Sequence, residues 1–251
     1  MDKYLQRTTL LVGENAQAEI SRVRIILFGV GGVGSWCAEV LVRSGVRHLT
    51  IVDFDTVSAS NVNRQLMATP ATVGEVKVEV LRRRLLEISP EAQIVSRNEH
   101  YSAQTAESFA LDSYDYIIDA IDSLKDKADL IKRGMAARGV LFSSLGAALK
   151  IDPTRVKVGN FWKARDCPLG AALRKKLRRE GGVQEHSFLC VYGDEVLPNL
   201  GVAAVGEEAL GAEALSAGKA TINGTAAHIT GIFGFTLAGL VIRDIYDRIN
   251  G

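Results

Sequence analysis

The sequence predicts an α/β fold in which a mostly parallel, Rossmann-like sheet has helices on both faces. Short apolar runs alternate with segments of helical spacing through the first 145 residues, and this alternation is typical of parallel strands joined by helices. The pattern changes after Gly146, where residues 150–158 alternate as an antiparallel strand does. We therefore expect a core over residues 1–146 and a C-terminal, partly antiparallel extension of the same domain over residues 147–251.

Apolar runs, helical spacing and chain breakers predict the elements in order. The run 23–28 has the length and composition of a buried strand and ends in glycines. Val76, Val80 and Leu81 begin a helical repeat that continues until Pro90 stops it. The same criteria predict strands over 23–28, 49–52, 93–97, 114–120, 140–145, 150–158 and 188–191, and helices that start at 36–42 or cover 75–88, 105–111, 124–138 and 166–179. Residues 193–219, rich in glycine and alanine, predict a mobile or irregular connection.

The composition is that of an ordinary globular protein, with 47% hydrophobic and 24% charged residues. A net charge of +1 names no partner. The three cysteines are widely spaced and form no Cys-x-x-Cys pair, which argues for a reducing compartment and against a structural zinc. The first residues lack the apolar core of a signal peptide. These features predict a cytoplasmic protein.

The segment 226–242 is apolar except for His228, Thr230 and Thr236. It approaches the length of a membrane span but falls short of about 20 residues. We expect a helix that is buried in the core or in a dimer interface, and membrane contact remains the alternative.

A glycine-rich motif follows the first predicted strand and precedes a helix. Glycines allow a tight turn and the close approach of a phosphate, which then faces the free N–H groups of the helix N-terminus. Asp53, directly after the second strand, stands where a carboxylate can hold a ribose hydroxyl. This much fits NAD or FAD as well as ATP. The predicted phosphate-binding residues are Gly29, Gly31, Gly32, Gly34 and Ser35.

A second polar segment favours triphosphate chemistry over dinucleotide binding. Asn61, Asn63, Arg64 and Gln65 lie close together, and Lys77 begins the next helix. NAD has no evident use for so many cationic and amide groups beyond the ribose, whereas a triphosphate that loses pyrophosphate requires them. The carboxyl ends of parallel strands meet at one edge of a sheet. We therefore expect three signals to converge there: the glycine loop, Asp53 and residues 121–123.

Together these motifs resemble the E1-like (ThiF-type) adenylating superfamily, over nearly the whole chain. Within it the chain is most similar to the tRNA threonylcarbamoyladenosine dehydratases. That branch is indicated by Asp119-Ala120-Ile121-Asp122-Ser123, by the Asp152-Pro153-Thr154 turn, by Asp166-Cys167-Pro168-Leu169 before a basic helix, and by the segment 231–235. The activators of sulfur-carrier proteins usually hold zinc with two Cys-x-x-Cys pairs, which this sequence lacks.

The resemblance implies ATP-dependent activation of a carboxylate. In the dehydratase branch this carboxylate belongs to the threonylcarbamoyl group on adenosine 37 of a tRNA, and the adenylate then cyclises with loss of water. The implied roles are catalytic for Arg64, Lys77, Asp122 and Arg7, with Asp122 also holding Mg²⁺. Nucleotide binding is implied for Asp53, Asp55, Asn61, Asn63, Gln65 and Ser123 beside the glycine loop.

The resemblance also implies a homodimer, because Arg7 matches an arginine that reaches the partner subunit's triphosphate in related activators. Two alternatives stay open. One is an adenylyltransferase that activates the C-terminal carboxylate of a ubiquitin-like sulfur-carrier protein, with that carrier or a sulfur donor as partner. The other is a nucleotide-binding regulator without catalysis.

Two basic clusters are candidates for a tRNA contact. The stronger is Arg174, Lys175, Lys176, Arg178 and Arg179 on one predicted helix, and the second is Arg82-Arg83-Arg84. Such clusters favour phosphate and make binding sensitive to salt, although a solvated helix face is equally compatible with them. No aromatic residue interleaves with either cluster, so the sequence predicts no platform for base stacking.

Overall fold

A single seven-stranded sheet organises the protein. The computed structural model describes residues 3–181, 187–201 and 223–251. The strand order is β3-β2-β1-β4-β5-β7-β6. All neighbouring pairs are parallel except β6 and β7, which form an antiparallel pair at one edge. The strands are β1 (Arg24–Phe28), β2 (His48–Val52), β3 (Gln93–Arg97), β4 (Tyr116–Asp119), β5 (Val140–Ser144), β6 (Val156–Asn160) and β7 (Leu189–Gly193).

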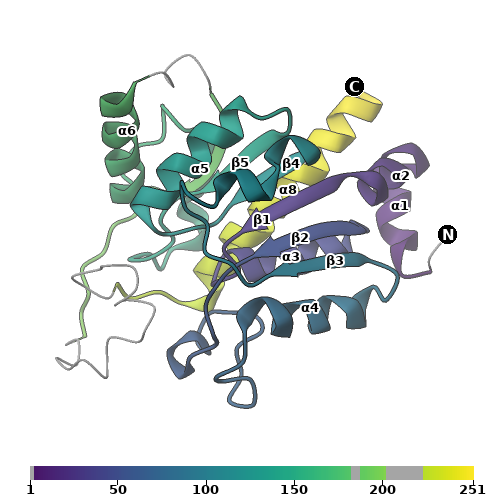
Figure 1. Cartoon of the computed structure of the whole chain (residues 1–251), viewed down its shortest axis with the longest axis horizontal. Coiled ribbons are helices and arrows are strands. Elements are labelled where there is room, and N and C mark those ends of the chain that lie inside the picture. The colour runs from purple at the N-terminus through teal and green to yellow at the C-terminus, as the bar shows by residue number, and fades with distance from the viewer. Residues whose placement is uncertain (1–2, 182–186, 202–222) are drawn as a thin grey trace.

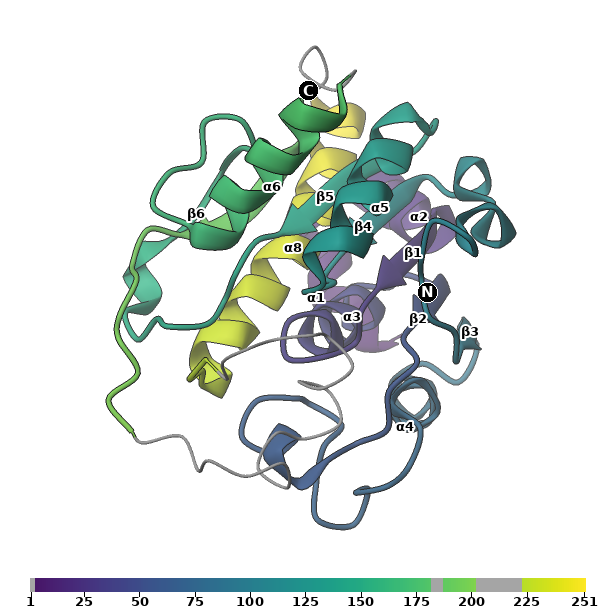
Figure 2. The same cartoon turned by 60° about the vertical axis from the view of Figure 1, so that its left-hand side comes forward.

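Helices cover both faces of the sheet, as predicted (Figures 1 and 2). One apolar core joins the sheet to α2, α3, α4 and α8, and a second core joins its other face to α5 and α6. The central strands are buried on both sides, which explains why they read as continuous apolar runs. The α-helices among the described residues are α1 (Gln6–Val12), α2 (Glu14–Arg22), α3 (Gly34–Arg43), α4 (Lys77–Ile88), α5 (Leu124–Ala136), α6 (Pro168–Glu180) and α8 (Ala227–Asn250).

Two predicted elements are wrong in part. The expected helix over 105–111 is replaced by two short 3-10 helices, η3 (Ala106–Phe109) and η4 (Leu111–Ser113), separated by Ala110 with φ +46°. The Thr105 and Ser108 hydroxyls donate to nearby carbonyls of His100 and Thr105, and such local bonds compete with a regular helix. The expected strand over 150–158 begins only at Val156, because a 3-10 turn over Pro153–Arg155 precedes it.

The sequence also left α1 and α2 unpredicted. The described part of the 193–219 connection, up to residue 201, has no helix or strand after β7. The remainder of that prediction lies outside the described residues.

Helix α8 is long and apolar enough, by length and composition, to cross a membrane, but half of that apolar window is buried inside the protein. It extends beyond the predicted 226–242 and packs along α3 in the core. Gly234 permits this contact, since a Cβ there would lie 2.4 Å from the Val33 carbonyl oxygen and 2.8 Å from Trp36 Cβ. The helix thus has the contacts of a core helix.

Candidate active site

The glycine motif forms a tight loop between β1 and α3 at the carboxyl edge of the sheet. Gly29 has φ +83°, and a Cβ there would lie 2.7 Å from the Ala120 carbonyl oxygen. A Cβ on Gly34 would lie 1.8 Å from the Gly29 carbonyl oxygen, and one on Gly32 would lie 3.0 Å from Thr230 Cγ2. These glycines are therefore required for packing of the loop. Gly31 has looser surroundings, since the nearest atom to a Cβ at that position would be Gln65 Nε2 at 3.7 Å.

Replacing Gly34 with alanine is expected to disrupt this loop, because neither the new methyl group nor the backbone it meets has room to move. We expect a loss of stability of at least about 1–3 kcal/mol, as for other overpacked sites, together with loss of nucleotide binding. Thermal melting and a nucleotide-binding titration measure both. Gly239→Ala is the matched control, because that helical glycine has no atom within 4 Å of the added carbon. Equal behaviour of the two variants would contradict the assignment.

Ser35 fastens the loop from within. Its fully buried hydroxyl donates to the Gly31 carbonyl at 2.7 Å and accepts from the Leu66 backbone N–H at 3.2 Å. The predicted phosphate ligand is thus bonded to its own chain, where it joins the glycine loop to the polar segment at 61–65.

Asp53 lies at the end of β2 and connects the glycine loop to the following turn. Its two carboxylate oxygens accept backbone N–H groups from Val30 at 2.8 Å and from Asp55 at 3.0 Å. Burial raises the pKa of Asp53, while the Lys77 charge and these hydrogen bonds act in the opposite direction. Each carboxylate oxygen has more than one lone pair, so the group can still accept a hydroxyl.

Lys77 is a buried cation at the first position of α4. Its side chain is 1% exposed, and its Nζ lies 2.9 Å from Asp55 Oδ2. The Lys77 backbone N–H also donates to the Asp55 carbonyl oxygen at 3.0 Å. The fold therefore brings three predicted site residues together, and Lys77 offsets the negative charge of Asp53 and Asp55.

Two buried amide side chains line the polar segment. Asn61 ends the 3-10 helix η2 (Ala59–Asn61), is fully buried, and accepts the Ser58 backbone N–H at 3.0 Å. Gln65 is 3% exposed, and its Oε1 is buried with no hydrogen-bond partner among the described residues. A buried polar atom without a partner is costly. Gln65, beside Gly31, therefore fits a site that is completed by a ligand.

The backbone of Arg64 is held by two residues that the sequence did not single out. Trp36 Nε1 donates to the Arg64 carbonyl at 3.1 Å, and the Thr230 hydroxyl donates to the same oxygen at 3.4 Å. The Arg64 guanidinium donates to the Asn63 side chain at 3.0 Å, and Asn63 donates to the Thr225 carbonyl at 2.9 Å. Helices α3 and α8 thus fix this cationic segment. Trp36 could have been suspected only from its place directly after the glycine motif.

A buried ion pair supports the loop that carries Asp122. Asp119 and Lys127 are both 0% exposed, and their charged groups lie 2.7 Å apart. Lys127 also donates to the Ile121 carbonyl at 2.9 Å, and Asp119 accepts the Ile121 N–H at 3.1 Å and the Ser143 hydroxyl at 2.6 Å. The loop is therefore clamped from both sides. The role of Lys127 could not be predicted from the sequence, because a lysine at this position of a helix is equally compatible with an exposed face.

Asp122 itself is exposed at this edge of the sheet. Ser123 caps α5, with its hydroxyl accepting the Asp126 N–H, and is thereby committed to the helix. Among the described residues, no group of three His, Cys, Asp or Glu side chains could hold a metal ion. A magnesium ion here would need substrate oxygens beside Asp122.

An aromatic edge borders Asp53. Phe54 is 45% exposed, and its ring centroid lies 4.6 Å from that of His100 in a T-shaped contact. His100 in turn lies 3.3 Å from the Asp126 carboxylate. The sequence missed this pair, because His100 follows β3 and meets Phe54 only in the folded sheet.

Arg7 is the predicted site residue that does not join the cluster. It is exposed on α1, and the elements around it contact the opposite ends of the helices: Tyr4 bonds Ser89 after α4, and Gln17 bonds the Ser44 carbonyl after α3. Figure 1 shows α1 and α2 by the N-terminus, away from the blue loops that follow β2. Within one chain, Arg7 is therefore remote from the glycine loop.

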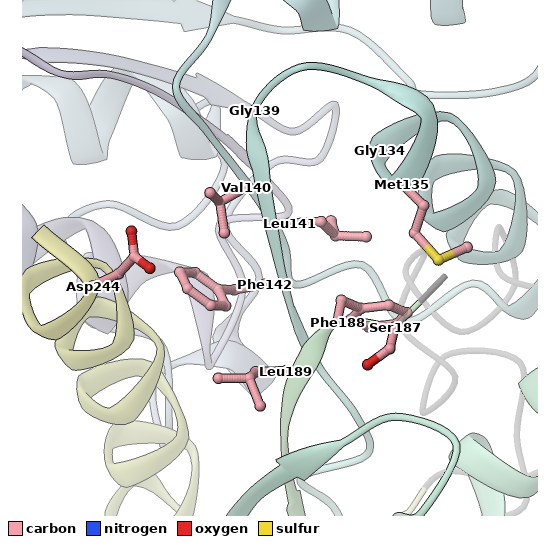
Figure 3. A pocket seen from close by; sticks show the side chains of 10 residues that line it. All are labelled: Gly134, Met135, Gly139, Val140, Leu141, Phe142, Ser187, Phe188, Leu189 and Asp244. Atoms are coloured by element: carbon pink, nitrogen blue, oxygen red, sulfur yellow. The ribbon is translucent and has the colours of Figure 1, made fainter. Parts of the chain in front are cut away.

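A cavity of about 350 Å³ lies at the other end of β5 and is not this site (Figure 3). Most of the side chains that border it are apolar, including Val140, Phe142 and Leu189. Its Asp244 carboxylate already accepts the Tyr116 hydroxyl at 2.7 Å. The converging polar groups and the glycine loop lie at the carboxyl ends of the strands, where ligands of such sheets bind.

Comparisons with known proteins agree with this geometry. A model described as the ThiF family matches residues 5–248. A tRNA threonylcarbamoyladenosine dehydratase of Bacillus subtilis (strain 168) is 40% identical over 181 residues, which cover 71% of each chain. The structure of E. coli tRNA N6-threonylcarbamoyladenosine dehydratase in complex with ATP is similar, with a TM-score of 0.86, 30% identity and coverage of 99% of this chain and 97% of that one. The molybdopterin-synthase adenylyltransferase of Escherichia coli (strain K12) is 32% identical over 189 residues, 75% of this chain and 71% of that protein.

Proposed function

This chain belongs to the ThiF family and to its tRNA threonylcarbamoyladenosine dehydratases, and we propose that it adenylates the threonylcarbamoyl carboxylate on adenosine 37 of tRNA and cyclises it. The observation that carries the proposal is the match, over nearly the entire length of both chains, to a dehydratase with ATP bound. The enzyme is an ATP-dependent adenylating enzyme of the E1-like class. The product is the cyclic form of the nucleoside, with loss of one water.

The chemistry needs positioning and charge neutralisation more than covalent help. A carboxylate is a poor electrophile, because its leaving group would be oxide. Its attack on the α-phosphate of ATP gives an acyl adenylate and pyrophosphate, and AMP then leaves readily. In our proposal the glycine loop cradles phosphate and Asp53 holds the ribose. Arg64 and Lys77 offset the charge of the outer phosphates, while the amides of Asn61 and Gln65 form hydrogen bonds near the phosphates.

The residues fit a magnesium ion bound together with ATP. Mg²⁺ keeps several waters and takes one or two carboxylates plus phosphate oxygens. Asp122, exposed beyond β4 on a loop that Lys127 clamps, would supply the carboxylate. When bound, the ion would neutralise phosphate charge.

The cyclisation needs no nucleophile from the protein. The ureido group attacks the adenylated carboxyl within the same molecule, and an intramolecular attack has a high effective molarity. All three cysteines are free thiols and buried. Burial raises the pKa of Cys190 to about 12, which disfavours its thiolate. The thiols have the character of core residues.

The test is to compare two acceptors with the purified protein and α-labelled ATP. We expect AMP and pyrophosphate with tRNA that carries threonylcarbamoyladenosine, and neither with a ubiquitin-like sulfur-carrier protein. The carrier protein is the relevant competitor because of the similarity to molybdopterin-synthase adenylyltransferase. AMP formed only with the carrier would move the assignment to that activity. Turnover with neither would leave a nucleotide-binding protein.

We further propose a homodimer in which Arg7 of one chain completes the site of the other. Two large apolar side chains beside Arg7 are exposed, Leu10 at 81% and Leu11 at 79%. Adjacent exposed leucines on a short helix are typical of an interface, and a two-fold interface there would present Arg7 to the partner.

Mixing two inactive variants tests the shared site. Arg7→Ala and Lys77→Met should each be inactive as homodimers. In an equal mixture, half of the dimers are mixed and each has one intact site, so we expect about a quarter of normal AMP formation. Activity no higher than that of the parent variants, or a monomer in sedimentation, would contradict the proposal.

We place the enzyme in the cytoplasm, which is reducing and contains tRNA, in keeping with three free thiols. Its contact with tRNA is assigned to the basic helix α6, through Arg174, Lys175, Lys176, Arg178 and Arg179.

A further inference from the structure

The two basic clusters differ in how their charges are used. In the 82–84 cluster, Arg83 lies 2.5 Å from Glu75, Arg84 lies 2.9 Å from Glu39, and Arg82 donates to the Ile94 carbonyl at 3.0 Å. Each of these cations is committed to its own fold. Carboxylates thus offset the charges of Arg83 and Arg84, and this cluster offers less net charge to an external phosphate than three cations would.

Helix α6 keeps much of its charge available. Lys176 pairs with Glu180 at 2.7 Å, and Lys132 of α5 reaches the same carboxylate at 2.8 Å. Together these lysines lower the pKa of Glu180 to about 2. The other exposed cations of this region have no carboxylate partner among the residues that the structure describes. They are Lys175, Arg178 and Arg179 on α6, and Lys163 and Arg165 on the segment before it.

An aromatic ring lies against this surface, contrary to the expectation from the sequence. The Arg178 guanidinium carbon lies 5.7 Å from the centroid of the Trp162 ring, and Trp162 is partly exposed. The buried Phe161 holds Trp162 in an edge contact at 5.0 Å and itself stacks on Phe188 at 4.8 Å. Trp162 precedes α6 and Arg178 lies near its end, so the folded loop brings them together.

The surface can be reached from the active site along α6. The helix begins at Pro168, where Gly146 after β5 lies beside Leu169 and Cys167, and it ends where Glu180 meets α5. At 1.5 Å per residue it is roughly 20 Å long. Figure 2 shows α5 and α6 side by side on the same flank of the sheet. A bound chain with one nucleotide at the carboxyl edge could therefore extend along α6 to Trp162.

We propose that Trp162 and Arg178 form a stacking pair for an unpaired base of the substrate RNA, with the surrounding cations of α6 and the 163–165 segment holding its phosphates. Unpaired RNA bases stack on aromatic rings and on guanidinium planes, and basic residues beside them follow the backbone. Cations without a carboxylate partner in the described part of the chain, beside an aromatic–arginine pair, fit RNA better than a protein partner, whose interfaces are depleted in lysine. The proposal rests on the proposed function for the identity of the RNA.

Steady-state kinetics with tRNA as the varied substrate test it. Trp162→Leu should raise the KM for tRNA by roughly 5- to 150-fold, the range expected for loss of one stacked base. The kcat at saturating tRNA and the KM for ATP should stay as in the wild type. Trp162→Phe should restore most of the loss, because it retains a ring. Arg178→Lys, which keeps the charge but loses the guanidinium plane, should be impaired as well.

Salt dependence separates this surface from a general effect of charge. Arg178→Ala should reduce the slope of log affinity against log salt for tRNA by about one. Arg83→Ala is the matched control, since it removes the same charge from the paired cluster, and it should leave affinity and slope unchanged. Variants of Trp162 and Arg178 that bind tRNA like Arg83→Ala would overturn the proposal.

Measuring the affinity of each variant for unreacted tRNA distinguishes failure of the stacking proposal from failure of the proposed function. Dehydration by the wild type, combined with unchanged tRNA binding of the variants, would overturn the docking surface alone. Weakened binding of Trp162→Leu without any dehydration by the wild type would support the surface and remove the proposed reaction.

Discussion

Replacing Lys77 with methionine is expected to lower kcat/KM for ATP in AMP formation by about 10²- to 10³-fold, the usual effect of removing one group that stabilises developing charge. Methionine keeps the length and the apolar stem of the side chain but removes the ammonium, which lies 2.9 Å from Asp55. Asp53 and Asp55 would then face a triphosphate without compensation. Initial rates of AMP release at varied ATP measure the effect.

A double variant separates two roles of this lysine. Lys77→Met with Asp55→Asn removes the carboxylate that Lys77 neutralises, so it should recover stability lost in the single variant. It should not recover activity, because the charge offered to phosphate is still missing. Recovery of activity in the double variant would show that Lys77 only neutralises carboxylates of the protein and does not act on the phosphates. More than half of the normal rate in Lys77→Met alone would show the same.

Replacing Lys127 with methionine is expected to lower the free energy of unfolding by about 3–5 kcal/mol, because it leaves Asp119 charged, buried and without its cation. Both side chains are 0% exposed, and their charged groups are 2.7 Å apart. The Ile121 carbonyl would also lose its donor, which loosens the loop that carries Asp122. Urea denaturation followed by circular dichroism gives the stability change.

The companion variant Asp119→Asn with Lys127→Met should cost less than Lys127→Met alone, since no buried charge is left unpaired. A loss below about 1 kcal/mol for Lys127→Met would mean that the pair contributes as an exposed one does. In that case the Asp119–Lys127 ion pair would not hold the Asp122 loop in place.

The parallel strands of the sheet could be predicted because buried parallel strands are continuous apolar runs that end at glycines or charged residues. The run before Gly29 and the run before Asp53 both became central strands. Elements whose sequence patterns are less regular were not predicted correctly. The 105–111 segment has helical composition, but its Ser and Thr hydroxyls bond the backbone locally. Helices α1 and α2 carry too few apolar residues to stand out.

Site residues could be predicted where they belong to a short sequence motif. They could not be predicted where they act through contacts between distant segments of the chain. The glycine loop and Lys77 were identified from the sequence motifs and Asp55 from the family resemblance, and the fold brings Lys77 and Asp55 together. Trp36 and Thr230 meet at the Arg64 carbonyl only because α8 returns to the start of the sheet. The aromatic partner of the basic helix likewise comes from a separate loop.

The most direct test of the central claim is the mass of the modified nucleoside after reaction. The wild-type enzyme is incubated with ATP, Mg²⁺ and tRNA that bears threonylcarbamoyladenosine. The RNA is then digested and analysed by mass spectrometry under conditions that preserve the ring of the cyclic nucleoside. We predict a nucleoside lighter by one water, formed with ATP and absent when a non-hydrolysable α,β-methylene analogue replaces it. An unchanged nucleoside mass in the presence of ATP would contradict the proposed dehydration.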